Sequence, residues 1–415
     1  MQIENPESFR QRLLQWASGH PYVCWLDNCD SDIDPHGRIE WMLGLSRGPG
    51  LHSWAEWEAQ RGNWIMGGLP YEWKSHLDQR LESANPPEIS WPELAGFVPE
   101  LLLLRLRGSD RLWVIKEEIE EWEAEIESQA PANEELVSPV FHSNFSRDGY
   151  LQTVEKLRQH IKEGDCYEIN LAQTFTAHAK INHPELLFLR LIGISPVPFA
   201  AYLKCGERHL ISASPERFLQ HRKRTLLTQP IKGTARRGST AQEDQRMIET
   251  LLHSEKERAE NVMIVDLSRH DLNQFCRPFS VQVPSLFHIQ SFPQVHQLVS
   301  TVRGELAEGV SATTALSGIF PPGSMTGAPK HKVMQLIDQY EPTGRGLYAG
   351  AVGYISPGGD FDFNVVIRSL MYAEEKEMLS YHVGGAITYD SDAEREYEET
   401  LLKASAIRKA LGAEA

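Results

Sequence analysis

The chain divides sharply in its use of tryptophan. All ten tryptophans lie between Trp16 and Trp122, and none occurs in the remaining 293 residues. Because large aromatic side chains dominate the cores in which they are buried, this shift predicts that the first third packs around its own aromatic-rich core. Residues 128–143, SQAPANEELVSPVFHS, carry two prolines among polar residues, a composition typical of a linker. We therefore expect an N-terminal domain over 1–127 and a second domain over 144–411.

Composition and charge restrict the partners of this chain. Of its 415 residues, 41% are hydrophobic and 24% are charged, which is ordinary for a globular protein. The net charge of −16 argues against nucleic acid or an anionic membrane as a partner. The N-terminus lacks a signal-peptide pattern, and no apolar run approaches the roughly 20 residues that span a bilayer. Five cysteines without a C-x-x-C pair suit a reducing compartment, so we expect a cytoplasmic protein.

Local patterns predict both strands and helices. Four stretches in the first third alternate or run apolar in the manner of β-strands, namely 21–26, 39–45, 63–68 and 101–107. Apolar residues between Tyr150 and Ile161 repeat at helical spacing, and Gly164 would end that helix. Ser391-x-x-Glu394 is a capping box, so we expect the last helix to begin at Ser391.

The stretch LTQPIKGTARRG places one lysine between two residues that constrain the backbone. Pro230 fixes its own φ, and Gly233 allows a close backbone approach that a residue with a Cβ would resist. A lysine acts as a nucleophile only when neutral, and burial or neighbouring cations lower its pKa in the required direction. We therefore expect Arg236 and Arg237 to lower the pKa of Lys232. The alternative, from these residues alone, is a solvated lysine in a surface turn.

Two helical segments each carry a pair of glutamates three residues apart. Glu257 and Glu260 lie in SEKERAENVMIVDL, and Glu396 and Glu399 lie in SDAEREYEETLLKA. Residues at i and i+3 project from the same side of a helix. Each pair also has an ordinary explanation, because Glu257 completes a Ser-x-x-Glu capping box and Glu399 can pair with Lys403 one turn later.

Five motifs occur in the order in which the chorismate-utilising enzymes carry them. They are SASPERFL at 212–219, PIKGT at 230–234, AENVMIVDL at 259–267, FPPGSMTGAPK at 320–330 and EREYEETLLKA at 394–404. Through them, residues 144–411 resemble that family. The resemblance implies an α+β chorismate-binding fold like that of anthranilate synthase component I, with large, mainly antiparallel sheets packed with helices. The lysine of PIKGT resembles the aminodeoxychorismate synthase branch, because anthranilate synthase large subunits typically carry alanine there.

The resemblance also implies a role for each matching residue. Lys232 would attack C2 of chorismate, and Glu216 would be the acid that protonates the departing C4 hydroxyl. The residues expected to contact the substrate are Glu168, Asn170, Ser324, Thr326, Tyr348, Arg368, Gly384 and Gly385. The residues expected to hold Mg²⁺ are Glu257, Glu260, Glu396 and Glu399, which together make an oxygen-only set of the kind that this hard cation selects.

The reaction implied by the resemblance is the conversion of chorismate and ammonia to 4-amino-4-deoxychorismate, on the route to 4-aminobenzoate and folate. The sequence has no G-x-C-x-G nucleophile of a glutamine amidotransferase, so ammonia would come from a separate glutaminase subunit or from solution. Two alternatives remain open, an anthranilate synthase large subunit and a catalytically inactive chorismate-binding subunit. Lys232 disfavours the first, and the acidic and basic residues matched above disfavour the second.

One segment departs from the family pattern. In SFPQVHQLVS, relatives usually carry a histidine immediately before LVS, whereas this chain has Gln297 there and His296 one residue earlier. Successive side chains of a strand point to opposite faces, so we expect these two residues to face apart and assign neither a role.

Overall fold

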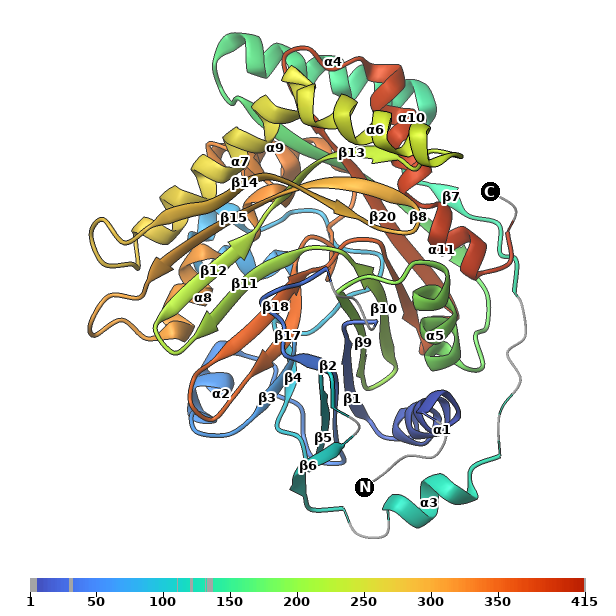
Figure 1. The fold of residues 1–415 in the computed structure, drawn as a ribbon. Coiled ribbons are helices and arrows are strands. Elements are labelled where there is room, and N and C mark those ends of the chain that lie inside the picture. The colour runs from blue at the N-terminus through green and yellow to red at the C-terminus, as the bar shows by residue number, and fades with distance from the viewer. Residues whose placement is uncertain are drawn as a thin grey trace.

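The computed structural model describes residues 6–29, 33–109, 111–119, 122–130, 132 and 137–413. Two large antiparallel β-sheets pack against each other, and helices cover them (Figure 1). The expected α+β class with large, mainly antiparallel sheets is confirmed. Among the helices of the described ranges, none is long and apolar enough to cross a membrane.

The larger sheet has eleven strands within the described residues. Their spatial order is β16 (Gly327–Ala328), β8 (Glu168–His178), β20 (Met378–Ile387), β19 (Ser369–Ala373), β10 (Arg208–Ser214), β9 (Phe199–Cys205), β1 (Tyr22–Asp27), β2 (Ile39–Ser46), β5 (Leu101–Leu106) and β6 (Leu112–Glu117), with β7 (His142–Ser143) beside β8. The register of β20 and β8 pairs Gly384 with Ala172 and Gly385 with Leu171.

The second sheet has nine strands in the part of the chain that the structure describes. Their order is β13 (Ile231–Arg236), β15 (Val295–Glu305), β12 (Thr225–Gln229), β11 (Arg217–Arg222), β18 (Phe361–Val365), β17 (Ala351–Ile355), β3 (Ile65–Leu69) and β4 (Ala95–Phe97), with β14 (Gln282–Ser291) on β15. The register of β13 on β15 shifts between Ile231 and Thr234, which places an irregularity at Lys232 and Gly233.

Helices cover both sheets. They are α1 (Pro6–Ser18), α2 (Trp54–Ala59), α3 (Trp122–Ser128), α4 (Arg147–Glu163), α5 (Pro184–Ile194), α6 (Ala241–His253), α7 (Glu255–Asn273), α8 (Ala312–Ile319), α9 (Lys330–Tyr340), α10 (Ala393–Lys403) and α11 (Ser405–Ala410), with 3₁₀ turns η1 (Tyr71–His76), η2 (Gln79–Leu81), η3 (Gly323–Met325) and η4 (Glu374–Lys376). Helix α7 packs on β13 and β15, and α10 packs on β20 and α4. As expected, α4 ends at Gly164, which has φ +85°.

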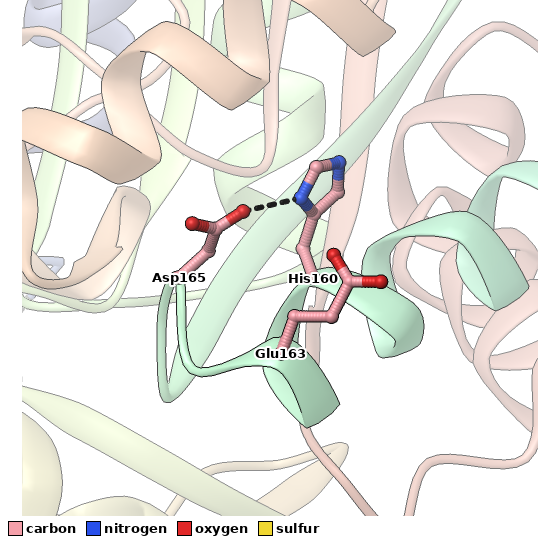
Figure 2. Close-up of side chains that lie close together, drawn as sticks. All are labelled: His160, Glu163 and Asp165. Carbon is pink, nitrogen blue, oxygen red and sulfur yellow. Dashed lines mark hydrogen bonds and ion pairs between the residues drawn. The ribbon is translucent and has the colours of Figure 1, made fainter.

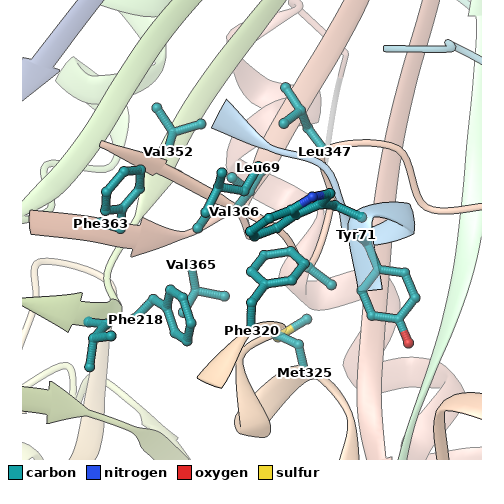
Figure 3. Close-up of a cluster of buried hydrophobic side chains, with 14 of the residues drawn as sticks. Leu69, Tyr71, Phe218, Phe320, Met325, Leu347, Val352, Phe363, Val365 and Val366 are labelled. Carbon is teal, nitrogen blue, oxygen red and sulfur yellow. The ribbon is translucent and has the colours of Figure 1, made fainter. Parts of the chain in front are cut away.

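The core between the two sheets draws on the whole chain. Figure 3 shows part of it, where Leu69 of β3 lies among Phe363 of β18 and Phe320 of the segment before η3. A second core lies on the other face of the larger sheet and combines Trp25 of β1 with Phe188 of α5. The expectation that the first third has its own core is therefore wrong.

The reason is strand pairing, which composition does not reveal. The four strands expected in the first third are confirmed as β1, β2, β3 and β5, but β1 pairs with β9 and β3 pairs with β17. The boundaries at residues 127 and 144 stay a prediction. Residues 131 and 133–136 of the predicted linker lie outside the described residues.

Candidate active site

Strands β8, β13 and β20 and helices α7 and α10 surround one pocket, and most of the predicted site residues line it. These are Asn170, Glu216, Lys232, Glu257, Glu260, Ser324, Tyr348, Arg368, Gly384, Glu396 and Glu399. Three predicted residues do not line the pocket surface: Glu168, Thr326 and Gly385. The segments that supply these residues span more than 200 positions of the chain, so it is the fold that brings them together.

Lys232 is held in a buried ion pair. Its Nζ lies 2.6 Å from Oε1 of Glu168, and the two side chains are only 11% and 1% exposed. Burial alone would lower the pKa of Lys232, but the carboxylates of Glu168 and Glu260 more than offset it and raise that pKa. The alternative of a solvated lysine in a surface turn is therefore wrong for this residue.

The two arginines after Lys232 do not act on it as expected. Arg236 pairs with Glu243 at 2.5 Å and Arg237 pairs with Asp244 at 2.8 Å, both on α6. Their charges are thus neutralised away from the pocket. The expectation that they lower the pKa of Lys232 is wrong, because acidic residues rather than cations surround the amine.

Glu216 has the properties that a proton donor needs at neutral pH. As a whole residue, Glu216 is 4% exposed. Oγ of Ser324 donates a hydrogen bond of 2.6 Å to its Oε1. Burial raises the pKa of Glu216 to about 7, although Ser324 and Lys232 partly oppose the shift. The next residue, Arg217, forms ion pairs with Asp34 at 2.7 Å and with Asp362 at 2.8 Å.

The four helical glutamates lie at the same pocket, with a lysine between them. Nζ of Lys256 lies 3.8 Å from Glu260 and 3.5 Å from Glu396, so it bridges α7 and α10. Oγ of Ser391 donates to Glu396 at 2.8 Å, and Lys403 pairs with Glu399 at 2.7 Å. Each of these contacts supplies a positive charge or a hydrogen-bond donor to a carboxylate that could otherwise bind a cation.

These carboxylates fit a divalent cation. Burial raises the pKa of Glu260 to about 7 and raises that of Glu257, although Lys232 and Lys256 oppose both shifts. Oε1 of Glu260 is buried without a hydrogen-bond partner among the described residues. An oxygen-only set of this kind matches the ligand preference of Mg²⁺. Within the described part of the chain, no three of these glutamates have carboxylate oxygens that all lie within 4.8 Å of one another.

The helix starts differ in part from the expectation. Oγ of Ser254 accepts the N–H of Glu257 at 3.3 Å, so the first turn of α7 is capped as predicted, while the Glu257 carboxylate itself lies at the pocket. Helix α10, expected to begin at Ser391, begins one residue later, because Asp392 accepts from the N–H of Arg395, and a separate helix, α11, follows it. Ser391 is thereby free to bind Glu396.

Another cluster with metal-ligand chemistry lies on the surface. Figure 2 shows His160, Glu163 and Asp165, whose ligand atoms lie within 4.8 Å of one another. Nδ1 of His160 is 2.7 Å from Asp165, and its Nε2 is 2.9 Å from the hydroxyl of Tyr340. Nδ1 thus contacts the turn that follows α4, and Nε2 joins α4 to α9, so both ring nitrogens have protein partners.

The remaining predicted residues belong to the wall of the same pocket. Tyr348 stacks on His382, with ring centroids 5.1 Å apart and an angle of 12° between the planes. A Cβ on Gly384 would lie 2.9 Å from the hydroxyl of Tyr348 and 3.0 Å from Nδ2 of Asn170, so only glycine leaves this space open. Arg368 has φ +54° and contributes to the same wall.

Two predicted residues have structural contacts instead. Oγ1 of Thr326 donates to the carbonyl of Gly323 at 3.1 Å, and its carbonyl accepts the N–H of Asn170 at 2.8 Å. Gly385 gives room to Glu396, since a Cβ there would lie 3.3 Å from the Glu396 Oε2.

The residues that line the pocket without having been assigned a role include three with ionisable side chains, Lys256, His382 and Lys403, as well as Gln297. Lys256 adjoins the predicted metal ligand Glu257, and Lys403 follows the predicted ligand Glu399 by one helical turn. Both positions could have been identified from the sequence. Gln297 and His296 face apart as expected, since His296 bonds Asp244 at 2.9 Å on the side away from the pocket. Nothing in the sequence pattern marks His382.

A buried lysine, a carboxyl with a raised pKa and a group of glutamates lie at one pocket, which makes this pocket the candidate active site. The model of the chorismate binding enzyme family matches residues 46–409. The chain belongs to this family.

The relatives agree with this assignment. The chain is 39% identical over 271 residues to aminodeoxychorismate synthase component 1 of Bacillus subtilis, covering 65% of this chain and 57% of that protein. It is 35% identical over 362 residues to anthranilate synthase component 1 of Thermus thermophilus, covering 84% of this chain and 77% of that protein. The chain spans less than two thirds of the length of the aminodeoxychorismate synthases that it matches.

A solved structure confirms the fold. The crystal structure of anthranilate synthase component I from Streptococcus pneumoniae superposes with a TM-score of 0.74 at 29% identity, covering 83% of this chain and 80% of that one. The fold expected from the sequence, like that of anthranilate synthase component I, is thereby confirmed.

Proposed function

We propose that this chain is the chorismate-aminating component of an aminodeoxychorismate synthase. It converts chorismate and ammonia to 4-amino-4-deoxychorismate, for 4-aminobenzoate and folate. The observation that carries the proposal is Lys232, a buried amine at the same pocket as the proton donor Glu216. Both 39% identity to an aminodeoxychorismate synthase component 1 and the PIKGT motif support it.

The reaction proceeds in two displacements. Nζ of Lys232 bonds to C2 of chorismate while the C4–O bond breaks, and Glu216 protonates the hydroxyl that leaves as water. Ammonia then bonds to C4 and displaces the lysine. Dividing one difficult displacement into two easier ones is the usual gain of covalent catalysis. Tyr348 and Arg368 hold a substrate carboxylate, a task that suits the planar fork of arginine.

Mg²⁺ is the cation that Glu257, Glu260, Glu396 and Glu399 would hold, and when bound it supplies the positive charge that a substrate carboxylate needs beside these glutamates. Ammonia comes from a glutamine amidotransferase subunit. In the described part of the chain none of the five cysteines forms a disulfide, which supports a reducing compartment and hence the cytoplasm.

A second candidate is anthranilate synthesis, favoured by the longer match to the Thermus enzyme. Product analysis with chorismate, Mg²⁺ and ammonium tests both. We expect 4-amino-4-deoxychorismate. Anthranilate as the main product would establish the second candidate. The absence of both products would mean that the chain is a binding subunit.

A further inference from the structure

One buried contact at the pocket, between Lys232 and Glu168, has no part in the two displacements. Lys232 lies on β13, at the end of the nine-stranded sheet, and Glu168 lies at the start of β8 in the other sheet. Their side chains meet at 2.6 Å, with Glu168 only 1% exposed. Lys232 lines the pocket, whereas Glu168 lies behind it and is not part of the lining.

The proposed attack sets a requirement that this pair can meet. The carboxylates around Lys232 raise its pKa against the effect of burial, so the amine carries a proton that it must lose before it can bond to carbon. The ionisable groups that act on it are Glu168, Glu216, Glu257, Glu260, Glu399 and Tyr348. Of these, only Glu168 forms an ion pair with it among the described residues.

The other nearby acids have competing tasks. Glu216 must itself be protonated to serve the departing hydroxyl, and Ser324 donates to its Oε1. Glu257, Glu260 and Glu399 belong to the set that would hold the cation. Glu168 is therefore the carboxylate at hydrogen-bond distance that is free to accept a proton.

We propose that Glu168 is the catalytic base that takes the proton of Lys232 as Nζ attacks, and the acid that returns it when the lysine leaves. This inference rests on the proposed function and deepens it. In the first step the N–C2 bond forms, the ring double bonds shift, the C4–O bond breaks and Glu216 gives its proton to the leaving oxygen. Nζ becomes a secondary ammonium, Glu168 becomes neutral and Glu216 becomes a carboxylate, so charge is conserved.

The second step restores the starting state. Ammonia bonds to C4, the ring double bonds shift back and the Nζ–C2 bond breaks, releasing a neutral amine. Glu168 then reprotonates this amine, and the new C4 ammonium returns one proton to Glu216. The site is thus ready for another turnover without an external proton carrier.

The test isolates the first step by leaving ammonia out. Chorismate and Mg²⁺ are mixed with the protein, and the adduct on Lys232 is followed by peptide mass spectrometry. Glu168→Gln keeps the size of the side chain but cannot accept a proton, so we expect adduct formation to slow by about 100-fold or more. The rate in this variant should rise with pH, because water then removes the proton. Chorismate binding, measured at equilibrium, should change little.

Two further variants complete the design. Glu168→Asp keeps the carboxylate one methylene farther away, and we expect it to be slower than wild type by about 10-fold but faster than Glu168→Gln. Its conserved charge leaves Lys232 with a buried counter-charge, so it decides the matter if Glu168→Gln does not fold. Glu185→Gln is the matched control, since it removes another buried carboxylate, on α5 and outside the pocket, and should leave the rate unchanged.

The outcomes separate this inference from the proposed function. If Glu168→Gln forms the adduct as fast as wild type or faster, Glu168 only holds the lysine protonated and the inference is overturned. The same follows if Glu168→Asp matches wild type, or if chorismate binding weakens while the saturated rate is unchanged. If wild type forms no adduct on Lys232, the covalent route of the proposed function fails first.

Discussion

At the scale of single residues, the pocket depends on charges that are buried with a partner. Lys232 and Glu168 are each other's nearest counter-charge, and both are largely hidden from water. Removing one member of such a pair leaves the other charge buried alone, which costs far more than losing an exposed pair. A change at either residue will therefore affect stability as well as chemistry.

Lys232→Ala should abolish the adduct and lower the free energy of unfolding by about 3 kcal/mol, because Glu168 is left without its partner. Adding Glu168→Gln to that variant should restore most of the loss, since an amide needs no counter-charge. Denaturant unfolding of the two variants checks this. Equal stability of the single and double variants would show that the pair does not bear on folding. Any residual product of Lys232→Ala should shift toward the ortho isomer, because the smaller side chain leaves room for ammonia to attack C2 directly.

Glu216 provides the second test at this scale. Its pKa is raised from 4.5 to about 7 in the folded protein, so the folded state binds this proton more tightly than the unfolded chain does. The stability that this supplies is present below pH 4.5 and is lost as pH rises to about 7. Glu216→Gln should therefore be more stable than wild type at pH 8, by at most about 3 kcal/mol, and no different at pH 4. Turnover of this variant should fall by about 100-fold or more.

Thermal unfolding across this pH range measures the difference. Glu249→Gln, an exposed change on α6, should show no such dependence on pH. A constant gap between Glu216→Gln and wild type at all pH values would mean that the carboxyl is not buried in its neutral form.

At the scale of elements, α7 and α10 bring like charges together from positions more than 130 residues apart. The i,i+3 spacing of each glutamate pair was visible in the sequence, and both pairs do reach the pocket. What the sequence could not show is that Lys256 bridges the two helices, because its partner Glu396 is distant in the chain. The same limit explains Arg236 and Arg237, whose acidic partners on α6 no local pattern reveals.

Activity should therefore require Mg²⁺, since these glutamates and the substrate carboxylates repel one another without it. Glu260→Ala should lose more activity than Glu257→Ala, because Glu260 is the more deeply buried of the two. The change in melting temperature on adding Mg²⁺ and chorismate, without ammonia, gives a readout besides turnover. Glu398→Gln, an exposed carboxylate on α10, is the matched control and should behave as wild type. Full turnover after exhaustive chelation would rule out the cation site.

At the scale of the whole molecule, the ordered motifs predicted the class of fold and eleven of the residues that line the pocket, whereas tryptophan content wrongly predicted a separate core for the first third. Motifs such as PIKGT carry information about a site because chemistry constrains them residue by residue. Tryptophan content carries information about burial only, and Trp57 and Trp25 are buried in two different cores that the rest of the chain completes. Which edge a strand pairs with depends on partners far away in sequence, as β1 and β9 show.

The shared sheets lead to a prediction about unfolding. Since β1 pairs with β9 and β3 pairs with β17, the first third cannot unfold without exposing strand edges and core of the remainder. Tryptophan fluorescence reports the first third alone, because all ten tryptophans lie there, while far-ultraviolet circular dichroism reports the whole chain. We expect the two signals to change at the same denaturant concentration, and a chain that begins at residue 144 not to reach the native fold. Separate midpoints, with residues 144–411 retaining their dichroism after the fluorescence has changed, would show that the chain has two independent domains.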